Sequence, residues 1–316
     1  MRGLLAPSRR VALAQALLVT FLWSTSWVLI KIGVQDLVLP PLTFAGLRYV
    51  LAALLLLPLA APALLRLRSA GAVQPRVLAS VAALGLILYA VTQGAQFAAL
   101  VHLPAVAVAL ALSTTPVLVA IIGLRGGEPP SRTQIGGALA VVVGAALYFG
   151  PLQLGPGAVI GLLIAAAGVA ANASSALLGR ALARDVLPAV GGVLGLTALS
   201  MAVGSVVLLG AGVVIEGIPP LTGQAWLIIG WLAVVNTAFA FTLWNHTLRT
   251  LTAVESSVMN NMMLIQIAVL AWIFLGEGLD VRQIAGLAIA LAGILLVQLH
   301  RPERVGPPVA ADEASA

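Results

Sequence analysis

The chain is dominated by apolar runs of the length that crosses a lipid bilayer. A membrane-spanning helix needs about 20 consecutive apolar residues, and such stretches recur along the whole sequence. Only 8% of the residues are charged and the mean hydropathy is +1.11, far from the balance of a water-soluble domain. We therefore predict an all-α integral membrane protein with ten transmembrane helices, near residues 11–31, 41–60, 77–98, 103–123, 133–150, 157–179, 188–212, 224–246, 252–274 and 282–299.

Arginine and lysine are distributed unevenly between the predicted loops. If the N-terminus is cytoplasmic, the outer side holds only Lys31 and Arg282. We expect a multi-pass protein of a prokaryotic cell membrane with both termini in the cytoplasm, and the net charge of +6 then reflects topology and not a nucleic-acid partner. The basic residues on the cytoplasmic side are Arg2, Arg9, Arg10, Arg66, Arg68, Arg76, Arg125, Arg132, Arg180, Arg184, Arg249, Arg301 and Arg304.

Several kinds of site are absent from the sequence. There is no cysteine, which excludes disulfides, thiolate metal sites and cysteine nucleophiles. No GxxxxGK[ST] phosphate loop is present, so we do not expect ATP-driven transport by this chain. Neither an HExxH motif nor a Ser-His-Asp arrangement stands out. We therefore predict no metal ion, no cofactor and no enzymatic activity.

The sequence resembles itself at an offset of 149 residues. The boundary is the Gly- and Pro-rich segment "GPLQLGPG", so we predict a first five-helix repeat at 11–150, a second at 157–299 and a disordered cytoplasmic tail at 300–316. Because five spans is an odd number, the second repeat enters the membrane from the opposite side, an arrangement typical of secondary transporters. The matches include Ser26 with Ser175, Lys31 with Arg180, Gly46 with Gly195, Glu128 with Glu277, Gln134 with Gln283, and Gly144 with Gly293.

Some of the repeated residues have a structural interpretation. Asp280 and Gln283 have the spacing of an N-cap and its reciprocal partner, as have Ser131 and Gln134 in the first half. Glu128 and Glu277 precede these caps, where we expect carboxylates to anchor the loops. Small residues at four-residue spacing permit close helix contact, namely Gly136, Ala140 and Gly144, and Gly286 with Ala290.

Four segments carry a resemblance to a known family. They are "WSTSWVLIKIG" (23–33), the arginine-containing "FAGLRYVLA" (44–52), "GGEPPSRTQIGGALAVVVGAAL" and "LGEGLDVRQIAGLAIALAGILL". The chain resembles the EamA-type permeases of the drug/metabolite transporter superfamily over roughly residues 11–299. It departs from the usual pattern at Ser24, where a glycine is common, and at Pro129-Pro130. The resemblance implies export of small metabolites such as amino acids, driven by a proton gradient or by the substrate's own gradient.

Two ionisable residues stand out within the apolar runs, because a charged side chain at the bilayer centre costs about 2.5–3.5 kcal/mol. Arg48 lies roughly 11 Å below the outer boundary and Glu255 about 5 Å above the inner one, which leaves about 14 Å of depth between them in a 30 Å core. A direct ion pair is therefore not expected. Arg48 can pair with helix-end carbonyls, bind a carboxylate or phosphate of a substrate, or extend to the interface.

The segment "ESSVMNNMMLIQ" (255–266) places polar side chains in the ninth span. At about 100° per residue, Val258, Ile265, Val269 and Trp272 share one arc, which we interpret as the lipid face. Asn260, Asn261 and Gln266 then point toward the interior, where they either bond neighbouring helices or line a binding site. Glu255 is either an interfacial carboxylate at the helix start or a site for proton coupling or a substrate ammonium group.

Two further polar stripes have helical spacing. Thr20, Ser24, Trp27 and Lys31 share one face of the first span, and Tyr89, Gln93 and Gln96 share one face of the third. Trp27 is equally explained by packing. We predict a substrate or coupling site formed by Arg48, Glu255, Gln96, Asn260, Asn261, Trp27, Tyr89, Gln93 and Gln266.

The function favoured by these patterns is secondary transport by alternating access, with a small molecule, the lipid bilayer and protons as partners. A membrane-embedded enzyme acting on lipids is one alternative, which the missing metal and phosphate motifs disfavour. A receptor or assembly subunit that transports nothing is another. In that case, large apolar side chains should fill the interior between the first, third, eighth and ninth spans.

Overall fold

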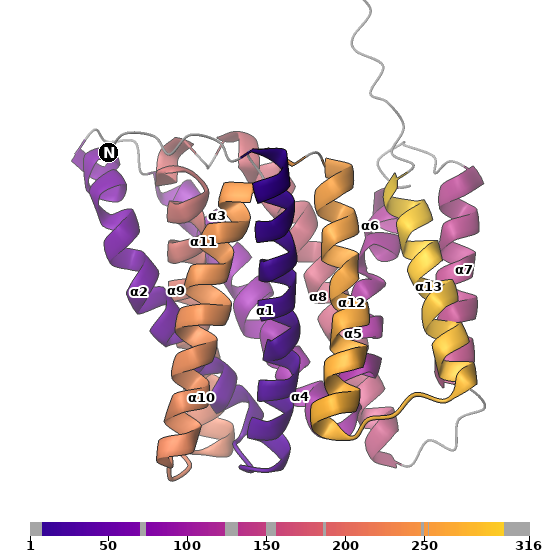
Figure 1. The fold of residues 1–316 in the computed structure, drawn as a ribbon. Coiled ribbons are helices and arrows are strands. Elements are labelled where there is room, and N and C mark those ends of the chain that lie inside the picture. The colour runs from indigo at the N-terminus through magenta and orange to yellow at the C-terminus, as the bar shows by residue number, and fades with distance from the viewer. Residues whose placement is uncertain are drawn as a thin grey trace, which may run out of the picture.

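The computed structural model describes residues 8–69, 74–123, 132–149, 156–185, 188–247, 250–251 and 253–299, and every regular element in these ranges is helical. The helices form a bundle whose long members run roughly alongside one another (Figure 1). The first half contains α1 (Arg9–Gln35), α2 (Pro41–Ser69), α3 (Pro75–Gly85), the π-helix η1 (Leu86–Gln93), α4 (Gly94–His102), α5 (Ala105–Ser113), α6 (Thr115–Gly123) and α7 (Arg132–Phe149). The second half contains α8 (Pro156–Asp185), the short 3₁₀ turn η3 (Pro188–Val190), α9 (Gly192–Glu216), α10 (Gly223–Ala233), the π-helix η4 (Val234–Phe239), α11 (Ala240–Thr247), α12 (Ala253–Leu275) and α13 (Val281–Leu299).

Many of these helices are long and apolar enough to cross a membrane. Six meet both criteria among the described residues, and the others include four shorter apolar helices at 105–119, 135–148, 259–275 and 281–296. The all-helical, membrane-spanning class predicted from the sequence is thereby confirmed. The count of ten spans stays a prediction, because the four shorter apolar stretches do not meet both criteria within the described residues.

The predicted fourth span, 103–123, is not one helix. It divides into α5 and α6 at Thr114. Pro116 has no backbone N–H to donate to the carbonyl of Leu112, four residues earlier. The hydroxyl of Thr115 donates to that carbonyl instead, at 2.6 Å. The hydroxyl thus satisfies the backbone where the helical ladder is interrupted.

The third and eighth predicted spans each contain a π-helical segment in the middle. Within η1, the Thr92 hydroxyl donates to the carbonyl of Ile87 at 2.9 Å, and within η4 the Thr237 hydroxyl donates to the carbonyl of Leu232 at 2.8 Å. In both cases the threonine reaches a carbonyl five residues back, which is the hydrogen-bond spacing of the π-helix. Such segments widen the helix locally and are frequent at functional sites.

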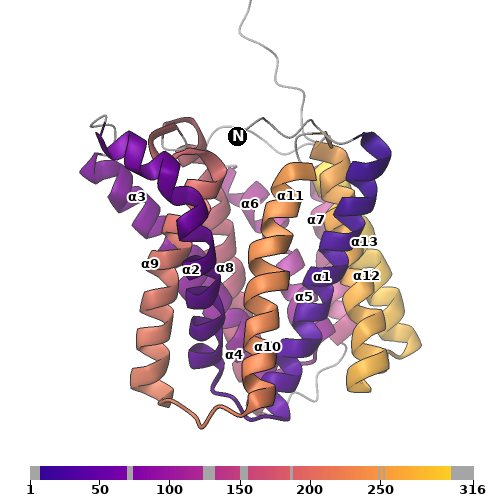
Figure 2. The same ribbon diagram turned by 60° about the vertical axis from the view of Figure 1, so that its left-hand side comes forward.

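The helices of the two halves follow one another at a nearly constant offset. The starts of α1 and α8, α2 and α9, α3 and α10, α5 and α12, and α7 and α13 lie 147 to 151 residues apart, and those of η1 and η4 lie 148 apart. Packing between the halves follows the same correspondence, since α2 packs along α9 and α7 along α13. Likewise α1 contacts α11 and α12, and α8 contacts α4, α5 and α6. Figure 2 shows α1 between α11 and α12.

Glycines let α7 and α13 approach closely. A Cβ added at Gly144 would lie 2.4 Å from the backbone nitrogen of Ala290, and one added at Gly293 would lie 2.5 Å from the carbonyl oxygen of Gly137. The prediction that Gly144, Gly286 and Ala290 lie at a close contact is confirmed. The inclusion of Gly136 was wrong, because nothing lies within 4 Å of a Cβ added there. Gly137 takes the place of Gly136 at the contact, beside Ala140 and Gly144.

Carboxylates and amides cap several helix starts. Asp280 Oδ1 accepts the backbone N–H of Gln283 at 2.7 Å, and Gln283 Oε1 accepts the backbone N–H of Asp280 at 2.9 Å, which confirms the predicted capping box. Ser131 and Glu128, and the side chain of Gln134, lie outside the described residues. Glu216, the last residue of α9, accepts the backbone N–H of Thr43 at 2.9 Å and so joins α9 to the start of α2.

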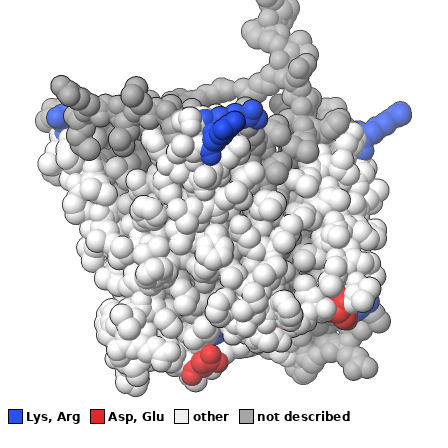
Figure 3. Space-filling model, viewed as in Figure 1, with Lys and Arg blue, Asp and Glu red and all other residues white. Residues whose placement is uncertain are grey.

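Charged residues gather at two opposite edges of the bundle. Figure 3 shows lysine and arginine along the edge where α1 begins and α13 ends, and acidic side chains along the other edge. The second edge holds the end of α1 at Gln35, the end of α9 at Glu216 and the loop between α12 and α13. We call this second edge the outer edge and the first the inner edge.

Candidate functional site

Arg48 is buried in the interior of the bundle, at 4% exposure. Its Nε donates to the Thr237 hydroxyl on η4 at 3.1 Å. The guanidinium carbon lies 4.9 Å from the centre of the Tyr49 ring and 5.9 Å from that of Phe97, within the range of cation–π attraction. Within the described ranges, no carboxylate lies at ion-pair distance from this guanidinium. Extension of the side chain to the membrane interface is excluded by its burial.

A second group of side chains holds Tyr49 in place beside Arg48. The Tyr49 hydroxyl donates to Gln93 Oε1 at 2.6 Å, and the rings of Tyr49 and Tyr89 lie 5.5 Å apart. Gln93 and Tyr89 both belong to η1. Arg48 therefore contacts η4 directly and is linked to η1 through Tyr49. Of the residues predicted for the site, Arg48, Tyr89 and Gln93 are brought together in one cluster.

Asn236, on η4 beside Thr237, joins the cluster to α1. It is fully buried, and its Nδ2 donates to the carbonyl of Leu22 and lies 2.9 Å from the Ser26 hydroxyl and 3.0 Å from the Thr25 hydroxyl. Its Oδ1 is buried and has no hydrogen-bond partner among the described residues. The sequence prediction missed Asn236. A lone polar side chain in the middle of an apolar run could have indicated it, as the lone charge indicated Arg48. An unpaired carbonyl oxygen there can accept one more N–H or O–H.

The polar residues of α12 separate into different environments. Gln266 Oε1 accepts the Ser24 hydroxyl on α1 at 3.0 Å, which is the interhelical bond that we considered for it. Asn261 is buried. The predicted lipid face is supported by Ile265, Val269 and Trp272, which are exposed by 41 to 64%. The side chain of Glu255 lies outside the described residues.

Asn260 is exposed, in contrast to the rest of its stripe on α12. Residues at i, i+4, i+7 and i+11 share one side of a helix. On this side Leu264, Ile267 and Ala271 are buried to 3% exposure or less. Asn260 is therefore the one exposed residue among these four positions of the stripe.

Trp27 and Gln96 complete the set of predicted residues. Trp27 is buried in the main hydrophobic core together with Ile30 and Phe44, as the packing interpretation expected. Its whole stripe on α1 faces inward, since Thr20, Ser24 and Lys31 are also buried. Gln96 is half-buried on α4, one turn beyond Gln93.

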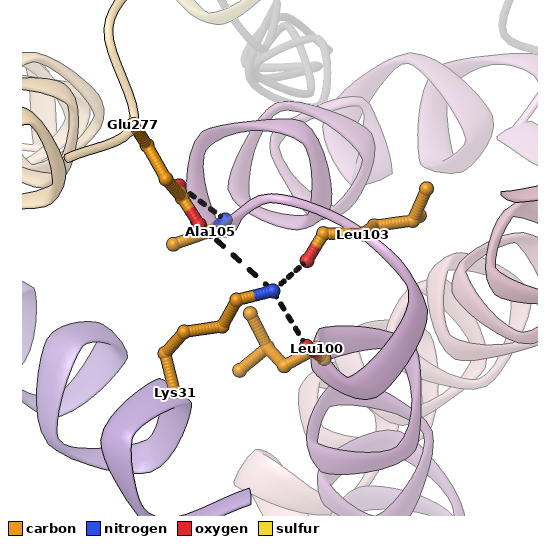
Figure 4. A network of polar contacts seen from close by, with 5 residues as sticks. All are labelled: Lys31, Leu100, Leu103, Ala105 and Glu277. Carbon is orange, nitrogen blue, oxygen red and sulfur yellow. Dashed lines mark hydrogen bonds and ion pairs between the residues drawn. The ribbon is translucent and has the colours of Figure 1, made fainter. Parts of the chain in front are cut away.

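Glu277 anchors the loop between α12 and α13, as predicted. Its Oε2 accepts the backbone N–H of Ala105, the first residue of α5, at 2.8 Å, and its Oε1 lies 3.8 Å from Lys31 Nζ (Figure 4). Burial raises the pKa of the Glu277 carboxyl, although the Ala105 N–H and the charge of Lys31 act in the opposite direction. No group of three or more His, Asp or Glu side chains suited to a metal occurs among the described residues.

Comparison with known proteins places this geometry in a family. The sequence profile of the EamA-like transporter family matches residues 10–150 and, a second time, residues 159–299. The chain belongs to the EamA-like transporter family. The resemblance seen in its motifs is thereby confirmed, and the chain is an integral membrane protein of a transporter family.

One protein is similar to this EamA-like chain in sequence, and one solved structure is similar to it in fold. A permease-like protein of Bacillus subtilis (strain 168), YdzE, is 35% identical over 75 residues, which cover 24% of this chain and 96% of YdzE. A solved crystal structure superimposes with a TM-score of 0.62 over 92% of this chain and 99% of the other, at 19% identity. At that identity the likeness concerns the fold alone.

Proposed function

We propose that this EamA-like chain is a secondary transporter that exports a small metabolite such as an amino acid by alternating access. It then acts as a carrier and not as an enzyme. The family match over both halves supports this proposal. The nearly constant offset between corresponding helices supports two five-helix repeats, at 11–150 and 157–299, that insert in opposite directions. The tail at 300–316 lies outside the described residues.

The orientation follows from the distribution of charge. The inner edge carries the described arginines at the start of α1 and the end of α2, including Arg9, Arg10 and Arg66. By the positive-inside rule this edge is cytoplasmic. The start of α1 and the end of α13 then both face the cytoplasm of a prokaryotic cell. The outer edge, with Glu216 and Glu277, then faces the opposite side of the membrane.

The observation that carries the proposal is the environment of Arg48. Its Nε is held by Thr237 and its face by the ring of Tyr49, while the described residues supply no carboxylate to pair with it. A guanidinium held on one edge keeps the geometry to bind a carboxylate with its two terminal nitrogens. We assign Arg48 as the contact for the acidic group of the substrate.

The remaining polar residues give this site a second part. Asn236 Oδ1 is a buried acceptor on the same π-helix as Thr237, suited to an N–H of the substrate. Gln96 is half-buried and Asn260 is exposed. We assign both to the path between the site and the cytoplasm. Glu255, in the first turn of α12 at the inner edge, stays the candidate for proton coupling.

The test is flux measurement in proteoliposomes that contain the purified protein. Amino acids and their decarboxylated amines are compared with and without an imposed pH gradient. We expect flux of acids over amines, a large loss in Arg48→Gln and a partial loss in Arg48→Lys, because an ammonium lacks the forked donor geometry. No flux of any of these solutes contradicts the proposal. Wild-type flux in a folded Arg48→Gln variant returns Arg48 to a structural role.

Proton coupling is tested in the same vesicles with Glu255→Gln. If Glu255 carries the coupling proton, the variant loses gradient-driven accumulation and keeps exchange of substrate for substrate, since only the protonation step is removed. Gradient-driven flux that is unchanged in the variant assigns coupling to another group.

The hydrogen bond between Thr237 and Arg48 is tested by a matched pair of variants, Thr237→Val and Thr237→Ser. Only serine retains the hydroxyl that holds Arg48, so only Thr237→Ser should keep flux.

A further inference from the structure

Lys31 lies near the outer end of α1, away from the cluster around Arg48, and takes no part in the proposed substrate site. Its ammonium group donates to the carbonyl oxygens of Leu100 at 2.8 Å and of Leu103 at 2.5 Å, at the end of α4 and in the following turn (Figure 4). Carbonyls at a helix end lack intrahelical donors and attract a cation. One side chain of α1 thus caps the C-terminus of α4.

Glu277 closes the same network from the other side. It stands in the loop after α12, next to Gly276, whose φ of +66° is a conformation that glycine adopts without strain. The two carboxylate oxygens divide their roles, one accepting the N–H of Ala105 at the start of α5 and the other facing Lys31. The side chains of Lys31 and Glu277 are 5% and 17% exposed. Three separate parts of the chain therefore meet at one partly buried ion pair: the end of α1, the α4–α5 turn and the α12–α13 loop.

The outer end of the bundle is closed where this network lies. On α12, the stripe that includes Leu264, Ile267 and Ala271 is buried. On α1, the stripe from Thr20 to Lys31 is buried up to the outer network. Any path from the interior to the outer side must therefore pass through these contacts.

We propose that Lys31 and Glu277 form the outer gate of the carrier: their network with the α4–α5 turn holds the outer end closed, and its separation admits the outward-facing state. The proposal rests on the proposed function, since alternating access requires such a gate. To open the outer end, α1 must move away from α4 and α5, and Lys31 is the side chain that binds it to their turn.

The energetics favour a two-state device. Removing Glu277 leaves the Lys31 charge unpaired in a buried place, which is unfavourable. Without Glu277, Lys31 would keep only two carbonyl oxygens as partners. Its ammonium group would then be more stable in water, and we expect α1 to move away from the α4–α5 turn with it. Glu277→Gln is the cleanest variant, because glutamine keeps an oxygen for the Ala105 N–H and loses only the charge.

The absence of cysteine allows a direct measurement, since introduced cysteines are the only thiols. Spin labels at Gln35→Cys and His102→Cys mark the exposed last residues of α1 and α4, on either side of the gate. Distance distributions are recorded by double electron–electron resonance in lipid nanodiscs. We expect one predominant short distance in the parent chain and a population at longer distance that rises several-fold in Glu277→Gln and in Lys31→Gln.

The matched control is Asp280→Asn with Arg282→Gln, which removes an exposed ion pair of 3.7 Å at the same outer edge. We expect the parent distribution in this control. A parent distribution in a folded Glu277→Gln variant overturns the gate, as does an equal shift in the control. Because no substrate is required, the result is independent of the flux assay. If the parent chain shows no flux but the distance distribution shifts in Glu277→Gln, only the proposed function is contradicted. If the parent chain shows flux but the distribution does not shift, only the gate is contradicted.

Discussion

The Tyr49 hydroxyl on α2 donates to the side-chain oxygen of Gln93 on η1 at 2.6 Å, directly beside the guanidinium of Arg48. Hydrogen bonds between membrane helices contribute about 0.6 kcal/mol on average and up to about 1.7 kcal/mol. A double-mutant cycle with Tyr49→Phe and Gln93→Leu should give a coupling free energy in this range. Thermal unfolding followed by the fluorescence of the six tryptophans measures it. Strictly additive single effects would contradict the bond.

The contact between α7 and α13 predicts different effects for two glycines of α7. Gly144→Ala places a Cβ 2.4 Å from the Ala290 nitrogen, so the backbones must separate. We expect a loss of about 1–3 kcal/mol in the free energy of unfolding, as for other overpacked interiors. Gly136→Ala meets nothing within 4 Å and should be neutral or stabilising by up to about 1 kcal/mol, since alanine favours the helix. Equal unfolding temperatures for the two variants would contradict the packing.

Asn236 offers a test of a buried amide. Its Nδ2 donates to the Leu22 carbonyl, so Asn236→Ala leaves that carbonyl without this donor. We expect a loss of about 1–3 kcal/mol in the free energy of unfolding, because a buried polar group loses its partner. Asn236→Asp keeps the size of the side chain but lacks the N–H donors of the amide, so it should be no more stable than Asn236→Ala. An unfolding temperature equal to that of the parent in Asn236→Ala would contradict the bond to α1.

The capping box at the start of α13 predicts a local effect. Gln283→Ala removes the acceptor for the Asp280 N–H, and Asp280→Ala removes the acceptor for the Gln283 N–H. Each should lower the free energy of unfolding by about 1 kcal/mol, whereas Asp280→Asn retains a good cap and should lose less. Hydrogen exchange should quicken only in the first turn of α13. An effect that spreads to α12 would show that the box also holds the loop.

Much of the molecule follows from local properties of the sequence. Apolar runs predicted membrane helices, spacing predicted the Asp280–Gln283 cap, and periodicity predicted the lipid face of α12 around Ile265 and Val269. The motifs predicted the family that the profile match confirms. Each of these features depends on residues a few positions apart, which is why periodicity alone was enough. The composition of the candidate site stays a prediction.

The limits of that reasoning are visible within single helices. Sequence periodicity assumed straight helices, so it missed the break at Thr114 and the π-helical segments η1 and η4. It also included Gly136 in the α7 stripe, whereas the contact uses Gly137. With glycine at both positions, periodicity could not choose between two faces about 100° apart. At the break and in the π-helices, threonine hydroxyls donate to backbone carbonyls, as Thr115 does to Leu112. Apolar periodicity does not report these local bonds.

The sequence by itself determined that this chain lies in a membrane, that it belongs to the EamA-like transporters and which side chains are polar within apolar helices. Only the tertiary structure decided their partners: Thr237 for Arg48, 189 residues away, and Glu277 for Lys31. The reason is physical. A polar group buried in an apolar interior requires a partner, so an arginine within an apolar run indicates that a partner exists. Which residue fills that role depends on how distant helices pack, and no local pattern records it.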